Sequence, residues 1–256
     1  MLGETARNWL RRWDEQQERY SPDREERFRV ILDVTRWSLE RASPERPRIV
    51  DLGCGTGSLT GRLARALPHA QVVGVDADPM MLGLAEEAVA GTGARLLLDD
   101  LNSPGWADRA APDGPWEAVV SSTALHWLEP ADLDALYRLL ADRLRPGGVF
   151  VDANNRAPEG SRAARALARR VRDARAERAG KADREDWDSW WKAFLAAPEL
   201  ADLARAREQR PIARRAFAPP LDLTTGEQTG MLRAAGFETV TTVWQCGDDS
   251  VLVALR

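Results

Sequence analysis

From residue 48 onward, short apolar runs alternate with segments whose apolar residues have helical spacing. The first run is RIVDL (48–52), and a helical segment with Leu59, Leu63 and Leu67 separates it from the next run, QVVGVD (71–76). The alternation continues through ARLLL (94–98), EAVVSS (117–122) and GVFVDA (148–153). Strand–helix–strand alternation places consecutive strands in parallel, so the sequence predicts an α/β fold with a mainly parallel sheet.

Two helices are predicted before the first strand. Trp9, Trp13 and Tyr20 fall near one face of the first helix. A second helical pattern follows Ser21-Pro22, where Ser21 can cap the helix and Pro22 can open it.

The alternation stops after Asn155 for about seventy residues, and the sheet pattern then resumes. A helical stretch of this length is too long for a simple crossover, so we interpret it as a lid on the sheet. Residues 226–235 predict a helix, and strands at 237–245 and 250–255 flank a tight turn, which makes a terminal β-hairpin. The predicted units are an N-terminal helical cap (1–45), a ligand-binding core (46–155), a helical lid insertion (156–225) and the C-terminal part of the core sheet (226–256).

The segment 160–181 within the insertion is strongly basic, with seven Arg and one Lys against two acids. Such a charge could attract an anionic substrate or RNA. We favour a solvated helix face instead, because small and apolar residues recur at helical spacing and nearby acids offset the charge. The predicted buried stripe consists of Ala164, Leu167, Val171 and Ala174.

A glycine-rich turn, Asp51-Leu-Gly53-Cys-Gly55-Thr-Gly57-Ser, follows the first predicted strand. In a doubly wound sheet this is where a nucleotide-like ligand binds, and alternate glycines let its atoms approach the backbone. The spacing fits neither the G-x-G-x-x-G turn of dinucleotide sites nor a P-loop. Asp51 would repel a phosphate here but suits an ammonium group, directly or through water.

Acidic residues also end the next two predicted strands. Asp76 comes 19 residues after Gly57, close to the spacing of about 20 for a carboxylate that binds both ribose hydroxyls. Asp99 and Asp100 end the third strand, where a carboxylate can accept the exocyclic amine of an adenine. Singly, these acids could be helix caps, solvated strand ends or turn residues. Together with Asp51 they describe a ligand with an amine, a ribose diol and an adenine amine, which is S-adenosylmethionine.

The motifs of residues 48–153 resemble those of the class I S-adenosylmethionine-dependent methyltransferases. VDLGCGTGSL resembles the first motif of the family, VVGVDADPMML the second, LLLDDL the third, EAVVSSTALHWL the fourth and LRPGGVFV the strand that follows. ALHWL is most similar to the small-molecule branch of trans-aconitate and biotin-pathway carboxyl methyltransferases, which usually carry Gln at the position of His126. The resemblance implies a Rossmann-like sheet of seven strands in the order 3-2-1-4-5-7-6, with strand 7 antiparallel. The departure at His126 leaves the substrate open.

Residue patterns and resemblance together give two sets of candidate site residues. The cofactor-binding candidates are Asp51, Gly53, Cys54, Gly55, Gly57, Asp76, Ala77, Asp99, Asp100, Leu101, Ser121, Trp13 and Tyr20. The acceptor candidates are His126, Trp127, Trp9, Trp187 and Trp191. Aromatic faces favour a sulfonium, although the lid tryptophans could equally pack the lid onto the sheet. His126 is the candidate catalytic residue because an unperturbed imidazole titrates near neutrality, and it could act as a base or position the acceptor.

Charge and composition narrow the partners. A net charge of -4, from 36 Lys and Arg against 40 Asp and Glu, provides no overall basic field for nucleic acid. Ser121-Ser122-Thr123 also stands where nucleic-acid methyltransferases carry their signatures. Two Cys and two His make a structural metal unexpected. No apolar run of about 18 residues and no secretory-type start are found, so we expect a cytoplasmic monomer or homodimer that engages no membrane.

The predicted function is transfer of a methyl group from S-adenosylmethionine to the oxygen, nitrogen or carboxylate of a small molecule in secondary metabolism, with S-adenosylhomocysteine as the product. Two alternatives use the same cofactor pocket. One is a lyase or cyclase that consumes S-adenosylmethionine without methyl transfer, and the other is a module that binds the cofactor without turnover. The products distinguish the three.

Overall fold

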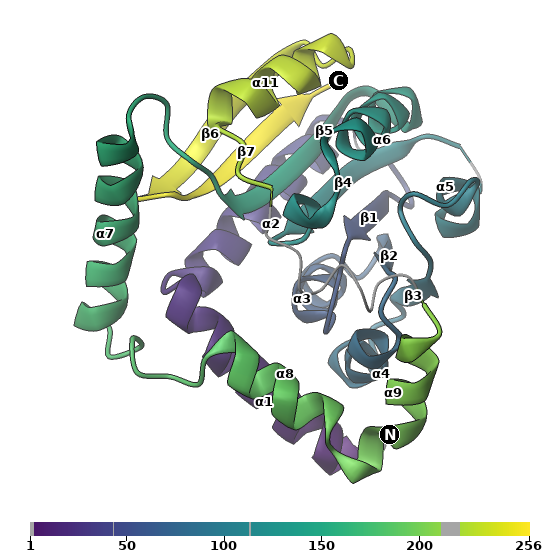
Figure 1. The fold of residues 1–256 in the computed structure, drawn as a ribbon. Helices are drawn as coiled ribbons and strands as arrows, with labels where there is room; N and C mark the ends of the chain where they lie inside the picture. The colour runs from purple at the N-terminus through teal and green to yellow at the C-terminus, as the bar shows by residue number, and fades with distance from the viewer. Residues whose placement is uncertain (1–2, 43, 113, 211–220) are drawn as a thin grey trace.

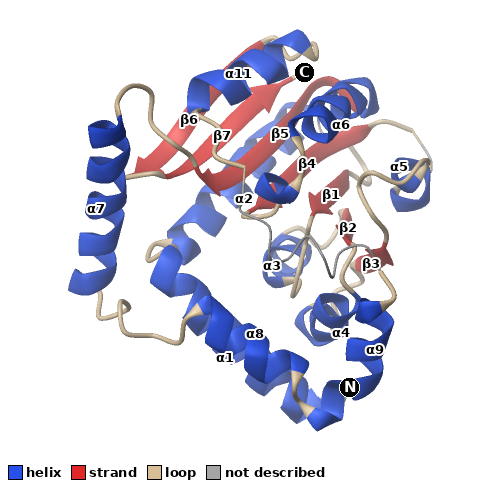
Figure 2. Cartoon of the chain, in the orientation of Figure 1, coloured by secondary structure: helices blue, strands red, loops and turns tan. Residues whose placement is uncertain are grey.

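The computed structural model describes residues 3–42, 44–112, 114–210 and 221–256. They form one mixed sheet with helices on both faces, as Figures 1 and 2 show. The seven strands of the described residues are β1 (Arg48–Leu52), β2 (Gln71–Asp76), β3 (Arg95–Leu98), β4 (Trp116–Ser122), β5 (Leu144–Asn155), β6 (Thr239–Cys246) and β7 (Asp249–Leu255). Their order is β3-β2-β1-β4-β5-β7-β6, and β7 runs antiparallel to both neighbours. The predicted fold class, strand order and antiparallel strand 7 are confirmed.

Helices that connect the strands cover the two faces of the sheet. On one face lie α2 (Arg24–Ala42), α3 (Ser58–Ala66) and α4 (Pro79–Ala88), and on the other lie α5 (Trp106–Ala110), α6 (Pro130–Arg143) and α11 (Thr225–Ala234). A short 3-10 turn, η1 (Leu125–Trp127), follows β4. Both faces of the central strands are therefore buried, as their continuous apolar sequences require.

A second group of helices packs beside α4 at the end of the sheet that β3 forms. It comprises α1 (Gly3–Tyr20), α8 (Trp187–Leu195), η2 (Pro198–Leu200) and α9 (Ala201–Glu208). Their shared core is rich in aromatic side chains and includes Trp9, Trp13, Trp190 and Phe194. α7 (Arg162–Arg178) contacts both α1 of this group and β6 of the β6–β7 hairpin (Figure 1). None of the described helices is long and apolar enough to span a bilayer.

Of the two helix N-caps predicted at Asp78 and Ser21, the structure confirms one. Asp78 caps α4 as its sequence predicts, because its carboxylate accepts a hydrogen bond from the Met80 backbone N–H at 2.9 Å. α2 instead begins at Arg24 rather than at Pro22. The Ser21 hydroxyl does not cap that helix. It accepts a hydrogen bond from the Arg27 side chain at 3.1 Å instead.

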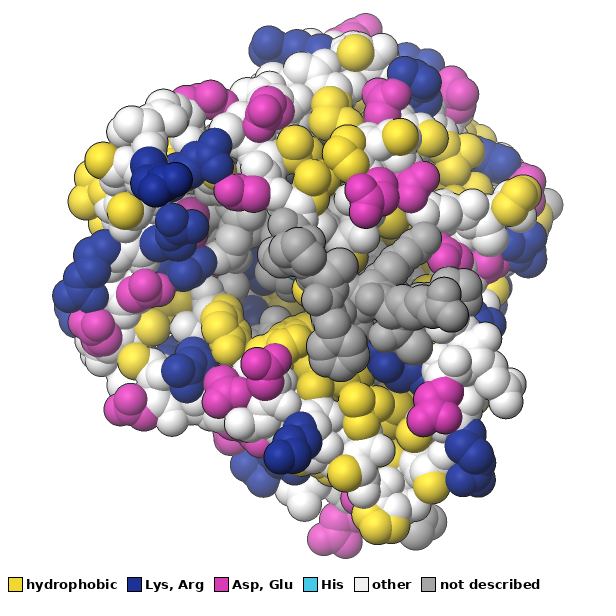
Figure 3. All heavy atoms as spheres, in the orientation of Figure 1, with side chains coloured by type: hydrophobic (Ala, Val, Ile, Leu, Met, Phe, Trp, Pro, Cys, Tyr) yellow, Lys and Arg dark blue, Asp and Glu magenta, His cyan; other side chains and the backbone are white. Residues whose placement is uncertain are grey.

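The buried stripe predicted for α7 is wrong. Leu167 is 66% exposed and Val171 is 43% exposed, and Ala176 is the buried residue of this helix. α7 is held by its arginines rather than by apolar residues, since Arg172 pairs with Asp248 at 3.0 Å and a second pair joins α7 to the loop before α2. Figure 3 shows basic side chains gathered at this edge of the molecule.

Candidate cofactor and acceptor site

The glycine-rich turn joins β1 to α3, and the surroundings of its three glycines differ. All three have positive φ, a region that other residues rarely adopt. A Cβ on Gly53 would lie 2.3 Å from the Ala124 Cβ, and a Cβ on Gly57 would lie 3.0 Å from the Ala85 Cβ. A Cβ on Gly55 would meet no atom within 4 Å. Gly53 and Gly57 therefore permit packing, whereas Gly55 borders the open space of the cavity.

Asp76 is the last residue of β2, and its carboxylate binds the backbone of the glycine-rich turn. Its Oδ2 accepts a hydrogen bond from the Gly55 N–H and its Oδ1 accepts one from the Asp78 N–H, each at 2.8 Å. Burial raises the pKa of this carboxyl to about 6. Each carboxylate oxygen can accept a further hydrogen bond, so Asp76 is suited to a pair of ligand hydroxyls.

Asp51 lies within β1 and is 1% exposed. Its Oδ2 accepts a hydrogen bond from the Thr60 hydroxyl at 2.6 Å. Burial raises its pKa to about 7, and the nearby charge of Asp76 acts in the same direction. A cationic ligand would favour ionisation of both carboxyls, so this wall of the cavity is complementary to a positive charge.

The two acids after β3 differ in their partners. Burial opposes ionisation of Asp99, but hydrogen bonds from Arg109 and Ser103 outweigh it and lower the pKa of this carboxyl. Arg109 Nε donates to Asp99 Oδ2 at 2.6 Å. The Asp100 carboxylate accepts the Asn102 N–H at 3.0 Å. Asp99 is thus engaged by Arg109, and both carboxyls line the cavity as candidates for an adenine amine.

Most of the predicted cofactor residues lie on one cavity at the carboxyl ends of the strands. The lining residues among them are Asp51, Gly53, Cys54, Gly55, Asp76, Ala77, Asp99, Asp100, Leu101 and Trp13. The structure places Gly57, Ser121 and Tyr20 outside the lining. Ser121 is buried in the sheet and donates to the Leu52 carbonyl at 2.9 Å, and the Tyr20 hydroxyl accepts the Trp187 N–H at 3.0 Å.

Three of the predicted acceptor residues line the same cavity, namely Trp127, Trp187 and Trp191. Trp9 lies elsewhere, because its ring packs on Trp190 at 5.8 Å and its indole N–H donates to Glu199 at 3.2 Å. This side chain belongs to the core between α1 and α8.

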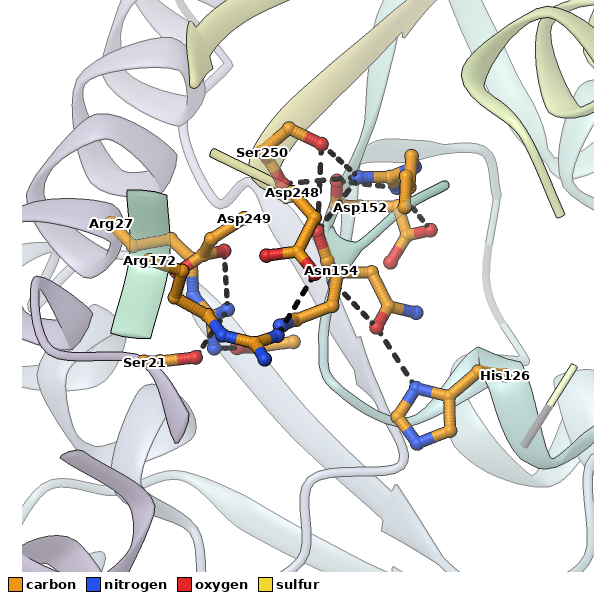
Figure 4. Close-up of polar contacts among 12 residues, drawn as sticks. Ser21, Arg27, His126, Asp152, Asn154, Arg172, Asp248, Asp249 and Ser250 are labelled. Carbon is orange, nitrogen blue, oxygen red and sulfur yellow. Dashed lines mark hydrogen bonds and ion pairs between the residues drawn. The ribbon is translucent and has the colours of Figure 1, made fainter. Parts of the chain in front are cut away.

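His126 lies beside the cavity rather than on its lining, with its ring 4.9 Å from that of Trp127. Its Nδ1 lies 2.9 Å from Asn154 Oδ1, which also accepts the Asn155 backbone N–H at 2.9 Å (Figure 4). Asn154 therefore presents its oxygen, so Nδ1 carries the proton and Nε2 carries the lone pair in the neutral ring. Burial lowers the pKa of His126, which keeps that neutral form dominant at pH 7.

A buried polar cluster behind His126 connects the cavity to β7. Arg27 of α2 pairs with Asp249 at 2.8 Å, and both side chains are almost inaccessible. Arg27 also donates to the Ser122 hydroxyl at 3.0 Å, and Ser122 lines the cavity. The sequence gives no signal for this pair because its members are 222 residues apart.

Sequence reasoning missed several other lining residues. They include Gln17, Arg24, Phe28, Met81, Thr123 and Arg207. Thr123 is the one non-glycine residue with positive φ in the described part of the chain, at 54°. A β-branched residue is strained there, and such strain clusters at functional sites. Arg207 comes from α9 and pairs with Asp78 at 2.6 Å, so the insertion reaches the cavity.

Comparison with known proteins agrees with the fold. Residues 49–148 match a family described as a methyltransferase domain. The chain is 36% identical over 133 residues to trans-aconitate 2-methyltransferase of Deinococcus radiodurans, covering 51% of this chain and 47% of the relative. It is 40% identical over 140 residues to the Mycobacterium tuberculosis enzyme of that name, covering 54% and 47%. The chain thus spans about half the length of the curated relatives it matches.

A solved structure extends the likeness of fold to nearly the whole chain. The N-methyltransferase NodS from Bradyrhizobium japonicum superposes with a TM-score of 0.51 at 16% identity, covering 92% of this chain and 96% of that one. The methyltransferase domain match at residues 49–148 and the strand order agree with the resemblance to class I methyltransferases, whose cofactor is S-adenosylmethionine. The buried acids Asp51 and Asp76 and the open space at Gly55 fit that cofactor.

Proposed function

We propose that this protein transfers a methyl group from S-adenosylmethionine to a small-molecule acceptor. The observation that supports it most is the arrangement of acids at the ends of three adjacent strands around one cavity. Asp51 would hold the ammonium group, Asp76 the two ribose hydroxyls, and Asp99 or Asp100 the adenine amine. Gly55 provides the space that the ligand needs next to the turn.

The cofactor supplies an electrophilic methyl carbon on a sulfonium, and the chain must hold a nucleophile in line with the carbon–sulfur bond. Asn154 Oδ1 accepts the proton on His126 Nδ1, so the lone pair of the neutral ring is on Nε2. Nε2 can therefore accept the proton of a hydroxyl or amine. The aromatic side chains of α8 and η1 would exclude water from the reacting atoms.

We further propose that the insertion at residues 156–225, of which 211–220 lie outside the described residues, acts as a lid together with the N-terminal helices. Support comes from the buried Arg207–Asp78 pair, which joins α9 of the insertion to the cap residue of α4 next to the cavity. The same proposal includes a cytoplasmic monomer or homodimer that does not bind nucleic acid, in keeping with the net charge of -4.

Product analysis tests the proposal. The protein is incubated with S-adenosylmethionine and a metabolite library, and mass spectrometry measures the nucleoside product and any mass gain of the acceptors. S-Adenosylhomocysteine together with a methylated acceptor supports methyl transfer. Methylthioadenosine would establish lyase or cyclase chemistry instead, and binding with neither product would leave a cofactor-binding module.

A further inference from the structure

Four tryptophans line the cavity that the acids define. Trp13 comes from α1, Trp127 from η1, and Trp187 and Trp191 from α8. Trp187 connects the group, because its ring centroid lies 5.6 Å from that of Trp13, 6.4 Å from that of Trp127 and 5.8 Å from that of Trp191. These four side chains, which we call the indole wall, are contributed by three segments far apart in the sequence.

Two members of the indole wall remain partly open. Trp13 and Trp191 are 8% and 5% exposed, but Trp127 and Trp187 are only half-buried. The rings of Trp127 and Trp187 lie within 28° of parallel. Flat apolar faces of this kind favour planar ligands, which bury area and stack at little conformational cost. One of the two rings belongs to the core and the other to the insertion, so a ligand here would contact both.

The charged residues of the cavity do not favour an anionic acceptor. The described lining contains five Asp and two Arg. Both arginines are engaged, since Arg24 pairs with Asp14 at 2.5 Å and Arg207 pairs with Asp78 at 2.6 Å. In the described lining, Arg207 Nη2 and Trp191 Nε1 are buried without a partner, so each can donate to one ligand acceptor atom. An acceptor with several carboxylates would therefore find no arginine free of an acidic partner in the described lining.

We infer that the methyl acceptor is a planar aromatic compound without carboxylates, held against the indole wall, with a hydroxyl or amino group as the nucleophile. This inference rests on the proposed methyl transfer. The nucleophile forms a bond to the methyl carbon while the carbon–sulfur bond breaks. The electron pair of that bond stays on sulfur, and the nucleophile's proton passes to a base. The acceptor class differs from the one named for the trans-aconitate relatives.

Calorimetry on protein saturated with S-adenosylhomocysteine tests the acceptor class with two probes, 2-naphthol and trans-aconitate. We expect 2-naphthol to bind at least about tenfold more tightly. Equal or tighter binding of trans-aconitate, or failure of 2-naphthol to bind the loaded protein, overturns the inference. Failure of S-adenosylhomocysteine itself to bind would contradict the proposed function, so the two failures are distinguishable.

Variants of the indole wall locate the binding surface. Trp187→Ala should weaken 2-naphthol binding by about fivefold or more and leave the affinity for S-adenosylhomocysteine within about twofold. Trp37→Ala is the matched control, because Trp37 is 45% exposed on α2 and lies outside the lining. Trp127→Ala provides the same test from the core side if Trp187→Ala does not fold. Unchanged 2-naphthol affinity in the folded variant would refute the assignment.

Discussion

The cavity has two halves that are built in different ways. The cofactor half consists of turns that directly follow β1, β2 and β3, and its acids are set by backbone hydrogen bonds such as those from Gly55 and Asp78 to Asp76. The acceptor half combines η1 with α1 and α8, which pack through aromatic side chains. The sheet thus fixes one half, and tertiary packing of an insertion fixes the other. Substitutions in the two halves should consequently change different measurements.

The largest expected effect belongs to the acceptor half. If His126 is the base for a hydroxyl or amine, His126→Gln should lower turnover by about 10²–10⁴-fold and leave cofactor affinity unchanged. Because burial lowers the pKa of His126, the wild-type rate should fall only as the pH drops below the usual range of imidazole. Steady-state rates across pH, with calorimetry of S-adenosylhomocysteine as the control, provide the measurement. Full activity with an unchanged pH profile would eliminate the base role.

The next effect concerns stability and contrasts two neighbouring helices of the insertion. Trp190 of α8 is fully buried, so Trp190→Ala should reduce the free energy of unfolding by about 3–5 kcal/mol. Leu167→Ala on α7 should change it by no more than about 0.5 kcal/mol, because Leu167 is 66% exposed. Urea unfolding measures both. Similar losses for the two variants would mean that α7 is also anchored by apolar packing.

A smaller effect is expected from pH in the cofactor half. The pKa of Asp51 is raised to about 7 in the ligand-free protein, so a cationic ligand must displace a proton below that pH. Affinity for S-adenosylmethionine should fall by up to about tenfold per pH unit below 7 and level off above it. Calorimetry from pH 5.5 to 8.5 would show it, with Asp51→Asn as the control that removes the fall between pH 7 and 6 and leaves the part below pH 6, where Asp76 also titrates. An equally steep dependence in the variant would assign the titration to another group.

The raised pKa of Asp51 also makes the stability of the ligand-free protein depend on pH. Folded Asp51 binds its proton more tightly than the unfolded chain, whose carboxyl has a pKa near 3.8. Its contribution to the free energy of unfolding should therefore decline as the pH rises from about 4 to about 7. Urea midpoints of the wild type and Asp51→Asn across that range measure the contribution. A wild-type midpoint that rises relative to the variant would contradict the sign.

The contrast between the halves also explains what could be predicted from the sequence. Motifs that follow a strand lie close together in the chain, so the strand order and the positions of Asp51 and Asp76 follow from spacing and family resemblance. The four tryptophans of the indole wall are all candidates from the sequence, but the contacts that bring their three segments together, and the Arg207–Asp78 pair, join distant parts of the chain, which spacing does not encode. The burial of Leu167 is wrongly predicted for the same reason. Helical periodicity identifies an apolar face but does not show whether another element covers that face.

In the proposed function, strand-end acids hold S-adenosylmethionine while the insertion holds the acceptor. Calorimetry of S-adenosylhomocysteine binding to Asp76→Ala and Trp187→Ala tests it most directly. Loss of the carboxylate leaves two ribose hydroxyls unpaired, so Asp76→Ala should bind about ten- to hundredfold more weakly, and Trp187→Ala should stay within about twofold of the wild type. Unchanged binding by Asp76→Ala, or an equal loss in both variants, would contradict this division of the cavity.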